Sequence, residues 1–174
     1  MKQLEMYDPR NPLAGQQLLR VFKEPLEQGQ DYFFIRNDEH LLIYREQLHT
    51  FPPNAIGGRA GTTKLFRYQF TIPLPGIRWF IDVIEKKFFK SPHEGGLPAH
   101  KLSYEEIVAG EDLHVMRSMG GGDRPGYTLT NATQRAHGAE RNPQRITLPD
   151  DWLFEGGLMD YLKELANKYE QGQL

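Results

Sequence analysis

The alternation of apolar and polar residues predicts one strand more clearly than any other element of the chain. In the segment "TTKLFRYQFTIP", over residues 62–73, large apolar side chains stand at every second position: Phe66, Tyr68, Phe70 and Ile72. A period of two places successive side chains on opposite faces of a strand. We therefore expect these rings to be buried on one face, while Arg67 lies on a mostly polar face that meets water.

A spacing of three and four residues predicts helices in other segments. The stripe that begins at Ile77 and ends at Phe88 predicts an amphipathic helix, which we expect to cover the aromatic face of the strand. A second stripe, from Leu158 to Tyr169, predicts a helix near the end of the sequence. Two shorter helices are also expected. One spans residues 12–24 between Asn11 and Pro25, and the other spans "YEEIVAG", with Ser103 and Glu106 as a capping box.

The remaining β-rich runs complete the predicted fold. Tyr32–Arg36 and Leu41–Gln47 flank the polar turn "NDEH" and predict a hairpin, and further strands are expected near Leu113–Met119, Tyr127–Asn131 and in "RITLP". The predicted order is helix, three strands, helix, two or three strands, helix. Hairpins connect most strands, so we predict an α+β fold. Its antiparallel sheet has about five to six strands with helices on one face, in a single domain over residues 1–174.

Composition narrows the class of protein. The 174 residues include 20 aromatic residues and no cysteine, which indicates a globular core without disulfides or thiolate metal sites. We see no apolar run of signal-peptide or membrane-spanning length. We therefore expect a soluble, cytoplasmic protein that contacts no membrane and binds no cofactor.

Charge is distributed unevenly, although the net charge is only −2. Residues 59–90 carry seven basic and two acidic residues, between two acidic flanks. A basic island of this kind is typical of an anion site or of a site for an acidic partner, and its alternative is pairing with the acidic flanks. The loop "IGGRAGTTK" within the island is the first candidate binding site. Five basic residues are the candidate ligand-binding residues, the last two in support: Arg59, Lys64, Arg67, Arg117 and Arg124.

A second glycine-rich segment, "RSMGGGDRPGY", contains Arg117 and Arg124. Phosphate-binding loops require a helix N-terminus directly after the glycines, and here the β-rich "YTLTN" follows. A hairpin tip is therefore the favoured interpretation, with an anion-binding flap as the alternative. Asp150 and Asp151 precede a helical segment and are interpreted as capping residues.

The six histidines show no metal-binding spacing. His93, Glu94 and His100 flank a turn and could meet His114 in space, but scattered surface histidines are the favoured interpretation, and we predict no metal site. His100 and His114 are the candidate acid or base residues if the protein is an enzyme.

The leading hypothesis is a non-catalytic binding or accessory protein. It would engage an acidic peptide, a partner protein or a small anion through its basic edge, and we expect a homodimer. The alternative is a small-substrate enzyme with a pocket between sheet and helices. Single-stranded nucleic-acid binding is a third hypothesis, which we disfavour because the protein is acidic overall and the rings of residues 66–72 are expected to be buried.

Overall fold

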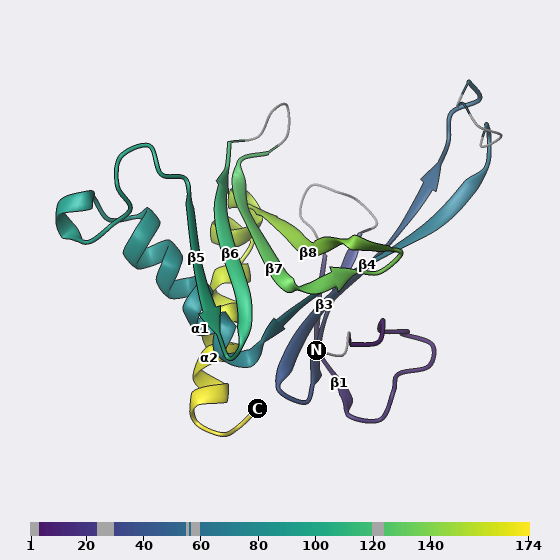
Figure 1. Cartoon of the computed structure of the whole chain (residues 1–174). Helices are drawn as coiled ribbons and strands as arrows, with labels where there is room; N and C mark the ends of the chain where they lie inside the picture. The colour runs from purple at the N-terminus through teal and green to yellow at the C-terminus, as the bar shows by residue number, and fades with distance from the viewer. Residues whose placement is uncertain (1–3, 24–29, 55, 57–59, 120–123) are drawn as a thin grey trace.

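A computed structural model describes residues 4–23, 30–54, 56, 60–119 and 124–174, and within them the chain forms two antiparallel sheets and two α-helices (Figure 1). The first sheet contains β1 (Gln16–Lys23), β2 (Asp31–Asn37), β3 (His40–Thr50) and β4 (Thr63–Pro73). The second contains β5 (Ser103–Val108), β6 (Glu111–Ser118), β7 (Gly126–Ala136) and β8 (Ala139–Pro149). The helices are α1 (Leu74–Val83) and α2 (Leu158–Glu170), with short helical turns at Ile84–Phe88, Pro92–Glu94 and Asp151–Glu155.

The order of elements is repeated. Four strands that pair with their neighbours in sequence are followed by a helix, and the same arrangement then occurs again. The two units also end alike: "FTIP" closes β4 and "ITLP" closes β8, and each proline stands before the helical segment that follows. The α+β class and the antiparallel pairing are thus confirmed, whereas the described residues form eight strands in two sheets rather than one sheet of five to six.

The helix predicted over residues 12–24 is wrong, because that segment contains strand β1. The β1–β2 register shifts between Leu18 and Arg20, which is the mark of a β-bulge. The bulge interrupts the alternation, so that Leu19 and Phe22 both pack against the core. The predicted helix, bounded by Asn11 and Pro25, placed Leu18, Leu19 and Phe22 on one face, and a spacing of three residues such as that of Leu19 and Phe22 is also compatible with a helix.

The short helix predicted at "YEEIVAG" is also wrong, because these residues form β5 and the turn after it. Ala109 and Gly110 both have positive φ, 50° and 82°, as a tight hairpin turn between β5 and β6 requires. Tyr104 and Val108 then alternate toward the core. A strand at the edge of the second sheet therefore replaces the expected helix.

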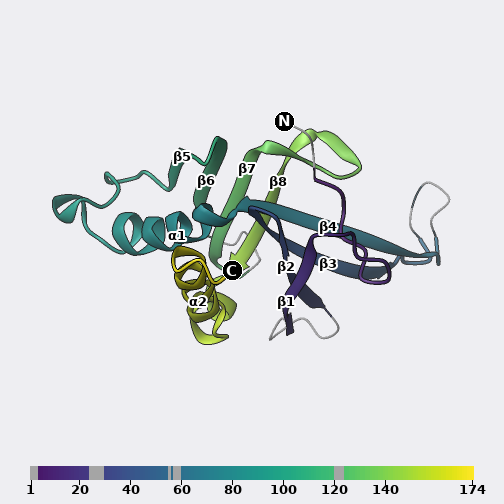
Figure 2. The same cartoon turned by 90° about the horizontal axis from the view of Figure 1, so that it is seen from below.

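One hydrophobic core joins both sheets to both helices. α1 and α2 lie side by side and cover the same side of the molecule, as both views show (Figures 1 and 2). Trp152 is fully buried among Phe22, Tyr32 and the residues of α2. The two helices predicted from the stripes of residues 77–88 and 158–169 are present, the first as α1 continued by the turn Ile84–Phe88.

The strands β3 and β4 extend beyond the rest of the first sheet. β2 pairs with β3 as far as Arg45, and beyond that point Glu46–Thr50 and Thr63–Arg67 pair only with each other in the described register. We call this two-stranded ribbon, together with Phe51, the arm. It projects away from the helices and from the second sheet in both views (Figures 1 and 2).

Because the arm projects, the prediction that the aromatic face of β4 is buried is correct for one end of the strand and wrong for the other. Phe70 and Ile72 are buried in the core, but Phe66 is half-buried and Tyr68 is 44% exposed. The opposite face differs too, because Gln69 and Thr71 are buried. Arg67 is exposed, as expected, and lies 3.3 Å from Glu46 of β3.

Candidate functional site

The structure separates the predicted basic residues into two groups. Lys64 and Arg67 lie on the arm, whereas Arg117 lies on β6 and Arg124 just before β7, in the other sheet (Figure 1). Arg59 lies outside the described residues. The described members of the basic set therefore contribute to two separate regions.

Arg117 and Arg124 each hold a carboxylate of the chain itself. Both terminal nitrogens of Arg117 donate to Asp150, at 2.5 Å each, and its guanidinium lies 4.7 Å from the Tyr127 ring centroid. Arg124 donates through Nε to Asp151 at 2.8 Å and also through a terminal nitrogen. The hydrogen bonds from Arg124 lower the pKa of Asp151. These two ion pairs fasten the β6–β7 end of the second sheet to the turn after β8.

The predicted capping role of the two aspartates is only partly present. Asp150 stands at the N-cap position of the turn Asp151–Glu155, but its side chain makes no capping hydrogen bond and binds Arg117 instead. Asp151 does accept a hydrogen bond from the backbone N–H of Trp152.

The candidate histidines are not gathered into one site in the described part of the chain. His100 occupies an exposed turn with φ of 68°. His114 lies on β6, where its ring nitrogens are 2.9 Å from Asp112 and 3.9 Å from Glu105. No group of three or more His, Asp or Glu side chains among the described residues is arranged to hold a metal ion.

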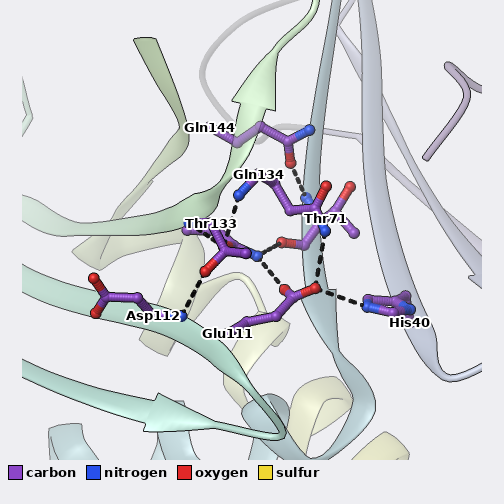
Figure 3. Close-up of polar contacts among 8 residues, drawn as sticks. His40, Thr71, Glu111, Asp112, Thr133, Gln134 and Gln144 are labelled. Atoms are coloured by element: carbon purple, nitrogen blue, oxygen red, sulfur yellow. Dashed lines mark hydrogen bonds and ion pairs between the residues drawn. The ribbon is translucent and has the colours of Figure 1, made fainter. Parts of the chain in front are cut away.

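A buried polar cluster lies where the two sheets meet (Figure 3). Its centre is Glu111, the first residue of β6, whose side chain is 1% exposed. His40 Nε2 lies 3.1 Å from Glu111 Oε1, Gln134 donates to the same oxygen at 2.8 Å, and Asn131 donates to Oε2. Burial alone would raise the pKa of Glu111, but the hydrogen bonds from these three side chains outweigh it, and the pKa is lowered.

The same cluster connects the edge of the first sheet to the second. Asn131 donates to the carbonyl of Thr71 at 2.9 Å, and Gln144 accepts from the N–H of Thr71 at 2.8 Å. Two side-chain amides of the second sheet thus satisfy main-chain groups of β4 that a neighbouring strand would otherwise bind. Because the ionised Glu111 is enclosed by donors from the protein, we interpret this cluster as a structural joint between the sheets.

A row of rings runs along one face of the arm and onto its base, where Tyr68 pairs with Arg45. His49 and Phe51 come from the β3 side, and Phe66 and Tyr68 come from β4. The His49 centroid is 4.7 Å from Phe51 and 6.2 Å from Phe66, and Phe66 is stacked on Tyr68 at 6.5 Å. We call these four residues the ring face. None of them belongs to the hydrophobic core clusters formed by the described residues.

Cationic side chains border the ring face. The guanidinium of Arg45 lies 4.5 Å from the Tyr68 ring centroid and 5.6 Å from that of Tyr32. Lys64, exposed on β4, is the register partner of His49. Across residues 45–67 the sequence has four basic residues and one acidic residue, Glu46. The ring face is therefore an exposed aromatic surface with positive charge at its border.

The opposite face of the arm carries one pair of leucines, between the Glu46–Arg67 ion pair and the hydrogen-bonded pair Thr50 and Thr63. Leu48 and Leu65 are register partners and are 72% and 39% exposed. With the base of the arm they line a groove of about 490 Å³, whose other lining residues are Gln30, Asp31, Phe33, Glu46 and Gln47. We call this surface the leucine face.

Sequence reasoning missed two parts of this arrangement. Glu111 is one acidic residue in an acidic segment, and no local pattern distinguishes it from its exposed neighbours. His49 and Phe51 follow the predicted strand Leu41–Gln47 and were interpreted as part of a loop. Their proximity to Phe66 and Lys64 follows once β3 and β4 are paired along their full length.

Comparisons with known proteins identify no relative. No family model, no curated protein and no solved structure matches the chain. Among the described residues, no helix has the length and apolar character that crossing a membrane requires.

Proposed function

We propose that this protein is a non-catalytic binding protein whose arm binds single-stranded nucleic acid along the ring face. The observation that carries the proposal is the row of four rings, bordered by Arg45 and Lys64, on a ribbon that projects from the body of the molecule. We also propose that it acts in the cytoplasm and as a homodimer.

The chemistry of the ring face suits unpaired bases. Aromatic side chains on strands bind bases by stacking, which contributes about 1–3 kcal/mol per base, while neighbouring cations bind the phosphates. Tyr68 is 44% exposed, and the guanidinium of Arg45 lies over its ring, where it can bind a phosphate beside a base that contacts the exposed part of the ring. Bases in a duplex are already stacked on one another, so a ring row on a narrow ribbon favours a single strand.

The sequence disfavours nucleic-acid binding partly because the aromatic side chains of residues 66–72 are expected to be buried. That reason does not hold for Phe66 and Tyr68, because Phe66 lies on the arm and Tyr68 at its base, and neither belongs to a core cluster of the described residues. The overall charge of −2 still disfavours broad duplex binding but does not weigh against a local site whose border is positive. An acidic peptide is the competing partner, because it would use the same cations without needing the rings.

The test is fluorescence anisotropy with labelled single-stranded DNA and RNA oligonucleotides, and with a polyglutamate peptide as the acidic competitor. Tyr68→Ala should weaken oligonucleotide binding about tenfold, the equivalent of one lost base stack. Lys64→Ala should reduce the slope of log affinity against log salt by about 0.7. Phe89→Ala is the matched control, because Phe89 is a more exposed ring outside the arm.

Three results would contradict the proposal. The first is that wild-type protein binds none of the oligonucleotides. The second is that Tyr68→Ala and Phe89→Ala bind with the affinity of the wild type. The third is that the peptide binds as tightly as the oligonucleotides and is insensitive to Tyr68→Ala, which would assign the arm to an acidic partner.

A further inference from the structure

The last two strands are the longest in each of the two repeated units. β3 and β4 have 11 residues each, and so do β7 and β8. β6 pairs with β7 only as far as Asn131, and beyond that point β7 and β8 pair only with each other in the described register. We call residues 132–143 the hairpin end. It is the counterpart, in the second unit, of the arm in the first.

The hairpin end and the residues directly after it are cationic. Residues 132–145 contain three arginines and one acidic residue, Glu140. Arg141 and Arg145 are exposed, and neither side chain forms an ion pair or a hydrogen bond with another described residue. Two guanidinium groups can therefore bind an anion from outside the chain.

The hairpin end lies beside the first sheet, on the side of the molecule toward which the arm projects. Asn131 and Gln144, directly before and after it, bind the backbone of Thr71 in β4. Tyr68, at the base of the arm, is three residues from Thr71 along β4, which is about 10 Å in a strand. In both views the hairpin end points, like the arm, away from the helices (Figures 1 and 2). A nucleic-acid strand that leaves the ring face at Tyr68 can therefore continue to the hairpin end.

The chemistry of the hairpin end differs from that of the ring face. Residues 132–145 contain no Phe, Tyr or Trp on which a base could stack, but their guanidinium groups can bind phosphates. We infer that Arg141 and Arg145 bind the backbone of a single strand whose other nucleotides stack on the ring face. This inference rests on the proposed function, and it makes the binding site longer than the arm alone.

The length of the oligonucleotide separates the two parts of the site. A strand of about 4 nucleotides can occupy the ring face alone, whereas one of about 16 nucleotides can extend from it to the hairpin end. Each phosphate contact contributes about 0.7 to the slope of log affinity against log salt for a single strand. The slope of the wild type should therefore be steeper for the longer strand, by about 1.4 for the two arginines.

The experiment measures this slope by fluorescence anisotropy with labelled thymidine oligonucleotides of the two lengths. The double variant Arg141→Ala with Arg145→Ala should lose about 1.4 from the slope for the longer strand and leave the shorter strand unaffected. Arg141→Lys with Arg145→Lys keeps both charges and should retain most of the slope. Lys90→Ala with Lys101→Ala is the matched control and should change neither slope. It removes two exposed cations from the segment before β5, which lies on the opposite side of the molecule from the hairpin end (Figure 1).

Tyr68→Ala separates failure of this inference from failure of the proposed function. If Tyr68→Ala weakens binding of both strands while the double alanine variant keeps the slope of the wild type, the ring face binds nucleic acid and the inference is wrong. Wild-type protein that binds neither strand would overturn both.

Two further results would contradict the inference alone. In the first, the lysine control lowers the slope for the longer strand as much as the double alanine variant does. In the second, the double alanine variant loses binding of a polyglutamate peptide but not of the longer strand, which would assign the hairpin end to an acidic partner. Thermal unfolding checks that every variant remains folded.

Discussion

Glu111 joins the two sheets through its side chain. It begins β6 in the second sheet and contacts His40, which begins β3 in the first, while Asn131 binds both Glu111 and the carbonyl of Thr71. A carboxylate that is 1% exposed is stable only when donors replace its hydration, and the three side-chain donors do so here.

Glu111→Gln should lower the free energy of unfolding at neutral pH by about 2–4 kcal/mol, because an amide cannot accept from all three donors. The pH dependence should also change. The pKa of Glu111 is lowered in the folded state, so the unfolded chain binds its proton more readily, and the wild type loses stability as the pH falls below the ordinary value of about 4.5.

Urea denaturation between about pH 3 and pH 7 measures both effects. The stability of Glu111→Gln should fall less steeply than that of the wild type over the acidic half of this range. Parallel profiles would show that Glu111 contributes nothing to the acid sensitivity of the fold.

The side chain of Thr71 differs from that of Glu111, because its buried polar group makes no hydrogen bond in the described part of the chain. Its backbone groups are bonded by Asn131 and Gln144, but its hydroxyl has no hydrogen-bond partner among the described residues. Thr71→Val replaces that hydroxyl with a methyl group of similar size, and we expect the free energy of unfolding to rise by about 1 kcal/mol.

The control is Thr128→Val, since the Thr128 hydroxyl is 3.0 Å from that of Thr147 and loses a hydrogen bond on substitution. This variant should lower the free energy of unfolding by about 0.5–1 kcal/mol. If Thr71→Val is less stable than the wild type, the Thr71 hydroxyl has a partner in solution.

At the scale of elements, the ion pairs at the end of the second sheet stabilise the fold. Arg117→Ala should lower the free energy of unfolding by about 1–2 kcal/mol, because it removes a bidentate ion pair that is partly screened by solvent. The affinity of the ring face for an oligonucleotide should remain unchanged. Loss of that affinity without loss of stability would instead favour an anion site at Arg117, as the sequence interpretation allowed.

How far each element could be predicted depended on whether its pattern is local. The stripes of α1 and α2 are regular, and both helices are where the spacing placed them. In β1 the bulge between Leu18 and Arg20 produced a helical spacing within a strand. The hairpin turn at Ala109–Gly110 was mistaken for the end of a helix, because "AG" is compatible with both.

The exposure of the ring face was harder to predict, because it depends on elements that are distant in sequence. Alternation in β4 shows that the rings share a face, but it does not show where along the strand the covering elements stop. Burial changes between Tyr68 and Phe70 because β4 leaves the body of the molecule there. Asp150, the carboxylate that Arg117 binds, lies 33 residues away in sequence, and no local pattern connects the two.

At the scale of the whole molecule, the arm and the body should be separable. We expect the body to fold after residues 48–65 are replaced by an Asn-Gly turn between the register partners Gln47 and Phe66. The core clusters among the described residues contain no side chain from the replaced segment. The melting temperature should therefore change little, whereas oligonucleotide binding should weaken, because His49, Phe51 and Lys64 are removed while Phe66 and Tyr68 remain.

Calorimetry and anisotropy on this one variant test both expectations. An unfolded variant would show that the arm is needed to build the body. A folded variant that binds oligonucleotides with the affinity of the wild type would show that His49, Phe51 and Lys64 do not contribute to the binding site.

The core shared by the two repeated units has a consequence for synthesis of the chain. The first four strands and α1 leave the ribosome early, but the cluster they enter is completed by Trp152 and by Leu158, Leu162 and Leu165 of α2. Until α2 has emerged, the nascent first unit exposes the apolar surface that α2 will cover. Its hairpins can form as they appear, but stable burial must wait until α2 has emerged, and this interval is when the first unit is most exposed to aggregation and to chaperones.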